Sequence, residues 1–143
     1  MTILEKLKEH TTSHPNKKAI ISDSSSFTFH EIDGYSDYIA DYVISNSTCN
    51  IIPMYIHNTL YIVPVVIGIL KSGKIPIPLT TDLQLEHALE RIADVDFDLV
   101  VLDSDLRYFT IFSYRKNIYA VIHGNLFKKN KYIFPVKIVI EKY

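Results

Sequence analysis

The sequence predicts an α/β protein with three layers, in which helices cover both faces of a mostly parallel sheet. Segments of strand length alternate with segments of helical periodicity along the first 103 residues. The candidate strands are apolar throughout rather than alternating, as expected of strands that are buried on both faces. At 143 residues the chain is long enough for a sizeable core, and we expect a single domain over residues 1–143.

The first elements are predicted as a helix followed by two short strands. Apolar residues at helical spacing in 3–7 predict a helix that ends before the turn signal at 14–16. Short strands are expected at 18–22 and 27–29, separated by a run of serines.

A long helix is predicted from about residue 30 to residue 45. Thr28 and Glu31 stand three residues apart, the spacing of a capping box, in which each side chain binds a free amide at the start of a helix. The apolar positions of this helix fall on one face, which we expect to meet the core: Ile32, Tyr35, Ile39 and Val43.

A strand at 50–56 precedes a second apolar helix. Asn58 or Thr59 is expected to cap that helix, and Gly73 to end it in the left-handed conformation. Pro64 lacks the N–H that a helix interior needs. The helix should therefore either kink at the proline or begin its regular part near Val63.

The remaining elements complete the alternation of strands and helices. The segment 75–79 should be extended, because each proline excludes the helical conformation from the residue before it. A capping box at Thr81 and Gln84 predicts another helix. Its apolar positions would be Leu85, Leu89 and Ile92, and further strands are expected at 98–102, 119–122 and 136–140.

Charge divides the chain into two parts, although the net charge is only −1. Residues 1–103 carry 7 Lys and Arg against 14 Asp and Glu, whereas residues 104–143 carry 8 against 2. The basic and aromatic side chains of the tail have the chemistry of single-stranded nucleic-acid binding or of docking an acidic partner protein. We interpret them as a solvated basic edge and expect no nucleic-acid binding. They are Tyr114, Arg115, Lys116, Tyr119, Phe127, Lys128, Lys129, Lys131, Tyr132, Phe134 and Lys137.

The sequence indicates a soluble, cytoplasmic protein. Its single cysteine, Cys49, excludes an internal disulfide and a cysteine-based metal cluster. The amino terminus mixes charged and apolar residues, unlike a signal peptide. The longest apolar run, residues 60–70, is shorter than the roughly 20 residues that span a bilayer, so no membrane association is expected.

No catalytic, cofactor-binding or metal-binding residue is predicted. His87 and Glu90 stand three apart on a helix, but we interpret them as a solvated face rather than a metal site. His57 follows a strand, where sites form in parallel sheets, yet a polar cluster at the start of a helix explains it as well. Cys49 has no basic neighbour in the sequence that would lower its pKa, and we expect no reactivity there.

One segment resembles a known family. Residues 67–79 read IGILKSGKIPIPL. They are similar to the helix–turn–strand signature of adenylate-forming (AMP-binding) enzymes, above all nonribosomal peptide synthetase adenylation domains, which read Leu-Lys-Ala-Gly before an aliphatic strand that ends in proline. Segments 14–20, 27–32 and 52–58 resemble, in order and spacing, the elements that precede this signature in the family.

The resemblance covers residues 1–103 and implies the front portion of the large adenylation subdomain, with 104–143 as a divergent tail. The family activates a carboxylic acid, usually an amino acid, as an acyl-adenylate with ATP and Mg. Its phosphate loop is rich in glycine, but the four glycines of this chain lie too far apart to form one. Its pocket motifs and the subdomain with its catalytic lysine are missing as well. The resemblance thus implies a chain truncated before the phosphate loop, inactive alone and binding no cofactor alone.

Three functions remain open at this point. In the first, the chain is a partial homologue of an adenylation domain from nonribosomal peptide and secondary metabolite biosynthesis. In the second it is half of a split enzyme, and in the third it is a non-catalytic docking module. The second function requires another chain as a partner, and the third a synthetase module. Self-association is also expected, because a family sheet cut at this point has an unpaired edge.

Overall fold

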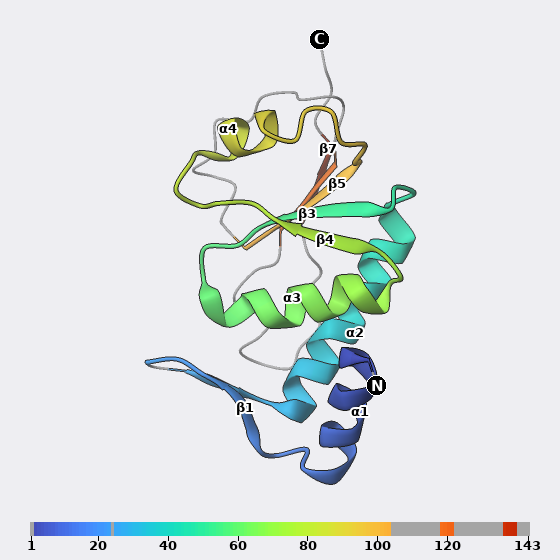
Figure 1. Ribbon diagram of the computed structural model, residues 1–143, viewed down its shortest axis with the longest axis vertical. Helices are drawn as coiled ribbons and strands as arrows, with labels where there is room; N and C mark the ends of the chain where they lie inside the picture. The colour runs from blue at the N-terminus through green and yellow to red at the C-terminus, as the bar shows by residue number, and fades with distance from the viewer. Residues whose placement is uncertain (1, 24, 104–117, 122–135, 140–143) are drawn as a thin grey trace.

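The computed structural model describes residues 2–23, 25–103, 118–121 and 136–139 (Figure 1). From residue 26 to residue 102 strands and helices alternate, as the sequence predicts. In chain order the elements are α1 (Ile3–Ser13), β1 (Lys18–Ile21), β2 (Ser26–Thr28), α2 (Phe29–Asn46), β3 (Ile51–Tyr55), α3 (Thr59–Lys71), β4 (Ile75–Pro78), α4 (Leu85–Glu90), β5 (Leu99–Leu102), β6 (Ile118–Val121) and β7 (Val136–Val139).

The main sheet has five strands in the order β4-β3-β5-β6-β7. Strand β3 is parallel to both β4 and β5, and β5 is parallel to β6. The β6–β7 pair is antiparallel. Strands β1 and β2 form a separate antiparallel pair. The predicted three-layer arrangement around a mostly parallel sheet is therefore confirmed.

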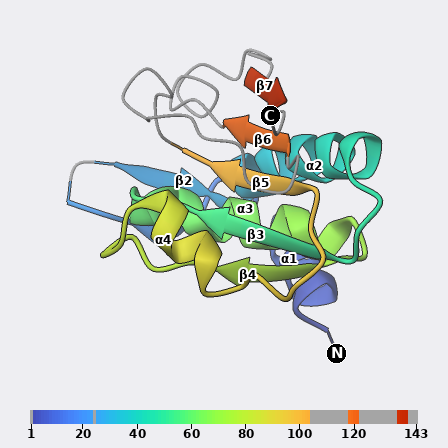
Figure 2. The ribbon, with the colours of Figure 1, turned by 90° about the horizontal axis from the view of Figure 1, so that it is seen from above.

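Helices cover both faces of this sheet (Figures 1 and 2). Alternate residues of β3 and β5 point to opposite faces, so each strand contributes to two clusters. The cluster on the side of α2 and α3 contains Phe27, Ile32, Tyr35, Ile39, Val43, Ile52, Met54, Ile56, Leu60, Tyr61, Val65, Ile69, Leu99 and Val101. The cluster on the side of α4 contains Tyr55, Leu85, Ala88, Leu89, Phe97, Val100 and Leu102.

A proline lies inside β3, an interior strand of the sheet. The carbonyl of Met54 accepts the Leu79 N–H at 2.8 Å, so the backbone of Met54 bonds toward β4. Alternation then turns the nitrogen of Pro53 toward β5, where it has no proton to donate. Pairing of β3 with β5 accordingly starts only at Met54 and Val101, although β5 begins earlier.

Helix α2 starts one residue earlier than predicted. The capping box is present: the Thr28 hydroxyl accepts the Glu31 N–H at 3.1 Å, and the Glu31 carboxylate accepts the Thr28 N–H at 3.0 Å. This makes Thr28 the cap and Phe29 the first helical residue. The expected strand at 27–29 therefore ends at Thr28. The predicted apolar face of the helix is buried, and its Val43 is fully inaccessible to solvent.

Helix α3 runs through its proline. Asn58 caps it, and the helix begins at Thr59, so of the two alternatives the one in which its regular part begins near Val63 is wrong. Pro64 and Val65 are buried, although Val63 is exposed, and this packing outweighs the lost hydrogen bond. Gly73 ends the helix with φ of 80°, as predicted.

Helix α4 is shorter than predicted. Gln84 is its cap but makes no side-chain capping bond, so the predicted box with Thr81 is wrong. The Thr80 hydroxyl instead accepts the Asp82 N–H at 3.2 Å and stabilises a turn there. Ile92 lies beyond the helix, where its N–H bonds to the carbonyl three residues back. That tighter bonding ends the regular α-helix after 6 residues.

Strands β6 and β7 match two of the predicted strands, at 119–122 and 136–140. Because β6 pairs with β5, the sheet continues past residue 103. The single domain over 1–143 and its division into 1–103 and 104–143 remain predictions. No helix within the described ranges is long and apolar enough to cross a membrane.

Candidate functional site

The carboxyl ends of β3 and β5 form the natural place for a site in this sheet. The chain leaves β3 toward β4 on one side and leaves β5 toward β6 on the other, as the strand order requires. Neighbouring strands whose connections diverge leave a crevice at their carboxyl ends, and ligands of open α/β sheets bind there. Helix α3 begins at this end of β3.

Asp103 holds this end together. Its Oδ1 accepts the His57 N–H at 2.9 Å, and its Oδ2 accepts the Asn58 N–H at 2.7 Å. The Asp103 side chain is only 4% exposed. The Asn58 side chain in turn accepts the Leu60 N–H at 3.0 Å. A negative charge at the start of a helix is favoured by the helix dipole, so this arrangement stabilises α3.

His57 lies beside this carboxylate. Its Nδ1 is 3.5 Å from Oδ1 of Asp103, and its ring packs edge-on against Tyr55 with centroids 4.8 Å apart. The imidazole is 47% exposed, so it remains accessible from solvent. The structure thus brings together His57, Asn58 and a buried carboxylate in the polar cluster expected at the start of α3.

Two tyrosines border the cluster. Burial, and after it the Asp103 carboxylate, raises the pKa of both Tyr55 and Tyr61. Both hydroxyls therefore stay protonated at neutral pH, and the Tyr55 hydroxyl donates to the Leu83 carbonyl at 2.6 Å. That bond ties β3 to the segment before α4.

The residues at this end do not fit the phosphates of ATP. Phosphates bind at a helix start through available amides and the positive end of the dipole. Here Asp103 already accepts two amides and Asn58 a third, which places negative charge where a phosphate would lie. Within the described ranges, no three His, Cys, Asp or Glu side chains gather as a metal site.

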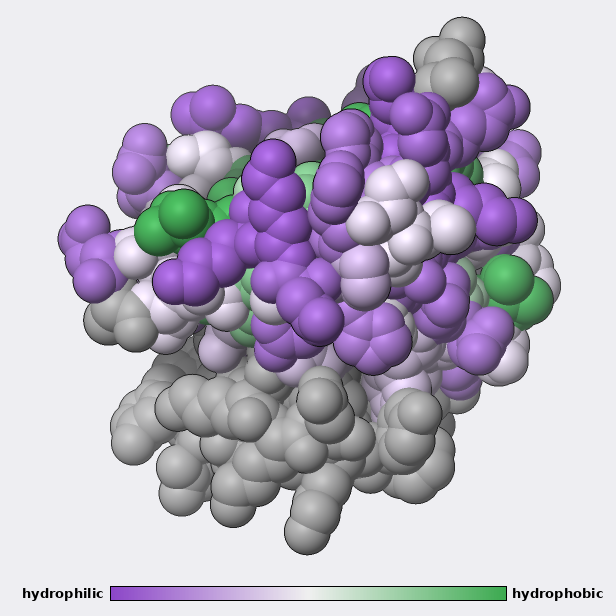
Figure 3. Space-filling view, turned by 90° about the horizontal axis from the view of Figure 1, so that it is seen from below, coloured by the Kyte–Doolittle hydropathy of each residue, from purple (hydrophilic) through white to green (hydrophobic). Residues whose placement is uncertain are grey.

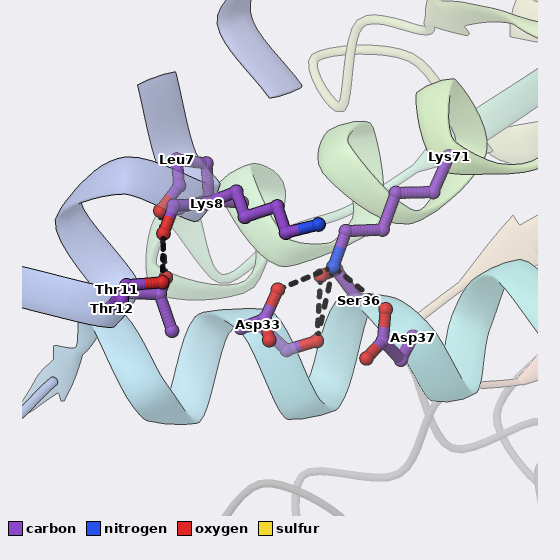
Figure 4. A network of polar contacts seen from close by, with 8 residues as sticks. All are labelled: Leu7, Lys8, Thr11, Thr12, Asp33, Ser36, Asp37 and Lys71. Atoms are coloured by element: carbon purple, nitrogen blue, oxygen red, sulfur yellow. Dashed lines mark hydrogen bonds and ion pairs between the residues drawn. The ribbon is translucent and has the colours of Figure 1, made fainter. Parts of the chain in front are cut away.

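The residues that match the adenylation signature are engaged in packing. A Cβ added at Gly68 would lie 2.7 Å from Cβ of Ile39 and 2.9 Å from the Ser36 carbonyl oxygen, so α2 and α3 touch where only glycine fits. The Lys71 ammonium lies 2.8 Å from a carboxylate oxygen of both Asp33 and Asp37 on α2 (Figure 4). This lysine therefore fastens α3 to α2.

The end of the signature helix is a Schellman motif. The Lys74 N–H donates to the Ile69 carbonyl at 3.2 Å, and the Gly73 N–H donates to the Leu70 carbonyl at 3.0 Å. These bonds turn the chain from α3 into β4. The glycine is required because φ is positive there.

The other residues weighed from the sequence make different contacts. His87 Nδ1 lies 3.6 Å from a carboxylate oxygen of Glu90, and both side chains are exposed on α4. Burial, and then Asp98 and Asp96, raises the pKa of Cys49. The basic and aromatic side chains of the tail lie outside the residues whose side chains the structure describes.

Cys49 does have a basic neighbour, contrary to expectation. The Lys74 ammonium donates to the Cys49 carbonyl at 2.6 Å and acts to lower the pKa of the thiol. Burial and the nearby aspartates outweigh it, so the thiol is not activated.

Asp98 and Asp103 were not recognised in the sequence as contact residues. At the amino end of β5, the Asp98 carboxylate accepts the Ser47 hydroxyl at 2.5 Å, and the Thr48 N–H and hydroxyl at 2.9 and 3.2 Å. Burial opposes ionisation of Asp98, but these hydrogen bonds from Ser47 and Thr48 outweigh it and lower its pKa. The one available signal was that both aspartates flank an apolar strand.

No protein-family model matches the chain. Over 69 residues, 47% of the chain, it is 35% identical to the nonribosomal peptide synthetase ftmPS of Neosartorya fischeri. Over 109 residues, 74% of the chain, it is 27% identical to long-chain fatty acid transport protein 6 of Mus musculus. The chain spans 3% of the length of the first relative and 18% of the second.

Solved structures share the fold. The fatty acid AMP ligase from Legionella pneumophila matches with a TM-score of 0.62 and 17% identity, over 71% of this chain and 19% of that one. VinN in complex with L-aspartate matches with a TM-score of 0.64 and 20% identity, over 73% of this chain and 28% of that one. In sequence the chain is thus similar to part of a nonribosomal peptide synthetase, and in fold to the N-terminal part of adenylate-forming, AMP-binding ligases.

Proposed function

We propose that this chain is a partial adenylation-domain homologue that contributes a scaffold to acyl-adenylate formation and does not catalyse that reaction alone. The reaction class is ATP-dependent activation of a carboxylic acid, in nonribosomal peptide and secondary metabolite biosynthesis. The location we propose is the cytoplasm, since a single unpaired cysteine suits a reducing compartment.

The observation that carries this proposal is that the residues matching the adenylation signature make structural contacts. Gly68 sets the spacing of α2 and α3, Lys71 pairs with two aspartates of α2, and Gly73 turns the chain into β4. All three serve the architecture. The cluster around Asp103 is arranged to stabilise α3 and carries charge of the wrong sign for phosphate.

The substrate class is carried over only as a carboxylic acid. The similar solved structures include a fatty acid AMP ligase and VinN bound to L-aspartate, so their names cover both fatty and amino acids. ATP and Mg would belong to a complete enzyme of this type, and we propose that the chain alone binds neither.

A split enzyme is the second candidate. The chain matches 19% to 28% of the length of these two neighbours, so a complementing chain would have to supply the phosphate loop and the lysine. A docking module is the third possibility. On the one face that Figure 3 shows, the side of α1 and β1, hydrophilic side chains dominate the described surface and the apolar spots are small and separate, so this face gives a docking site no support.

The test is ATP–pyrophosphate exchange by the purified chain with a panel of amino acids and fatty acids, with a complete adenylation domain as the active control. ATP binding is followed by calorimetry on the same sample. We expect neither exchange nor ATP binding. Exchange above the background of a no-protein control would contradict the proposal.

A second arm distinguishes the split enzyme from the scaffold. The chain is mixed with an adenylation domain from which the matching front segment has been deleted. Exchange that appears only in the mixture would favour the split enzyme. If neither the chain alone nor the mixture catalyses exchange, the result favours a scaffold without activity.

A further inference from the structure

Among the strands that the structure describes, β4 lies at an edge of the main sheet (Figure 2). An edge strand normally presents a row of outward N–H and C=O groups, onto which a strand of another chain can add. This edge is apolar as well: Ile75 is 57% exposed, and Ile77 follows two residues later. An exposed edge rich in β-branched residues is a place where copies of a chain associate.

The direction of each backbone N–H in β4 follows from its partners. The Ile75 N–H donates to the Asn50 carbonyl at 2.9 Å, and the Leu79 N–H donates to the Met54 carbonyl at 2.8 Å. Ile77 lies between them in the parallel register, so its N–H also points toward β3.

At the alternate residues of β4 the backbone groups point away from β3, toward the open side of the strand. Both of these residues are prolines. Pro76 and Pro78 have no N–H, so they cost the β3–β4 ladder nothing at this edge. The Lys74 N–H before them is used in the end of α3. From Lys74 to Leu79, therefore, every backbone N–H is either absent or bonded inside the protein.

We propose that Pro76 and Pro78 close the β4 edge to strand addition, so that a second copy of this chain cannot extend the sheet there. An added strand needs donors as well as acceptors from the edge that it joins. The edge offers only outward carbonyls, those of Lys74, Pro76 and Pro78, because each shares a trans peptide unit with an N–H that points toward β3 or with one inferred to do so. This inference does not depend on the proposed function. The expectation that the sheet edge left by the missing part of the family's fold invites association concerns another edge and stays a prediction.

The first experiment restores the missing donors with the double variant Pro76→Val/Pro78→Val. Sedimentation velocity over a range of concentrations measures self-association. Two regained N–H groups per copy should tighten self-association by about tenfold or more. Each single variant should have an intermediate effect. Pro15→Val is the matched control, since Pro15 lies in a turn outside the sheets, and it should behave as the parent. A folded double variant that associates no more than the parent overturns the proposal.

The second experiment keeps both prolines, so it does not depend on whether the proline variants fold. A Cys49→Ser/Ile75→Cys variant places the sole thiol on the β4 edge, at an exposed position. Under oxidising conditions we expect no more disulfide-linked dimer than for a Cys49→Ser/Ile44→Cys control, whose thiol is exposed on α2. Efficient trapping through position 75 alone would show that copies meet at this edge and would overturn the proposal.

Discussion

Two regions hold this structure together by different kinds of contact. In the α2–α3 seam, where Gly68 meets Ile39 and Ser36, the helices touch so closely that a single added carbon collides. At the two ends of β5, the carboxylates of Asp98 and Asp103 bind the segments that precede and follow β3. The seam depends on shape, whereas the ends of β5 depend on charge and hydrogen bonding.

This difference has a physical consequence for each region. Close-packed apolar contacts are insensitive to pH but respond to a change of one methyl group. Carboxylates that accept several hydrogen bonds tolerate changes of volume around them but fail when they are protonated or removed. The α2–α3 seam should therefore respond to a change in side-chain volume but not to pH. The ends of β5 should respond to pH and to loss of a carboxylate.

The largest effect is expected from Gly68→Ala. The new methyl group would lie under 3.0 Å from Ile39, which is 1% exposed, and from a backbone oxygen, so α2 and α3 must move apart. Overpacking of this kind costs about 3 kcal/mol of the free energy of unfolding, and the higher helix propensity of alanine returns up to about 1 kcal/mol, so we expect a net loss of at least about 2 kcal/mol. Urea denaturation measures it.

Gly34→Ala is the matched control, because no atom lies within 4 Å of its added Cβ. It lies on α2, so the higher helix propensity of alanine should raise stability by up to about 1 kcal/mol. Equal effects of the two substitutions would show that the seam is not close-packed.

Asp103→Ala is expected to cost about 2 kcal/mol. The substitution leaves the amides of His57 and Asn58 without their carboxylate and removes a negative charge from the start of α3. Asp103→Asn keeps one acceptor and should lose less. Urea denaturation of both variants gives the difference, and an alanine variant as stable as the parent would refute a fastening role.

Asp98 makes the amino end of β5 sensitive to acid. Its pKa is lowered in the folded protein, so its contribution to stability is complete above the ordinary aspartate pKa of 3.8. That contribution is lost as the pH falls below this value, through the folded pKa, because the unfolded chain then binds a proton more readily.

The measurement compares the parent with Asp98→Asn in urea at pH 7, 5, 4 and 3. The parent should be the more stable at pH 7, and the difference should shrink below pH 4. Asp41→Asn, at an exposed position on α2, should leave the pH profile unchanged. A difference between parent and Asp98→Asn that is constant down to pH 3 would contradict the assignment.

The seam was more predictable from the sequence than the ends of β5. Its signals are local: the capping box of Thr28 and Glu31, the apolar face of α2, and Gly73 at the end of α3. The carboxylates of β5 bind groups 45 to 51 residues away, and no local pattern marks such pairs. Two local rules also failed. Pro64 was expected to disturb α3, which runs through it, and Thr81 was expected to form a capping box before α4, where no side-chain capping bond is present.

Lys71→Met should have the smallest effect and is the sharpest test of what holds the seam. Lys71 is 17% exposed and pairs with Asp33 and Asp37, which are 38% and 63% exposed. Ion pairs with exposed partners contribute at most about 1 kcal/mol, and methionine preserves most of the aliphatic packing. We expect a loss below 1 kcal/mol that becomes smaller in 1 M salt, where exposed charges are screened.

The comparison of Lys71→Met with Gly68→Ala decides whether shape or charge dominates between α2 and α3. Both substitutions act on the same pair of helices, so a common method of denaturation makes their losses directly comparable. If the lysine variant loses more than the glycine variant, the helices are held by their ion pairs and the contrast with β5 disappears. If it loses less, the signature lysine acts as a supplementary fastening on a contact that is set by the glycine.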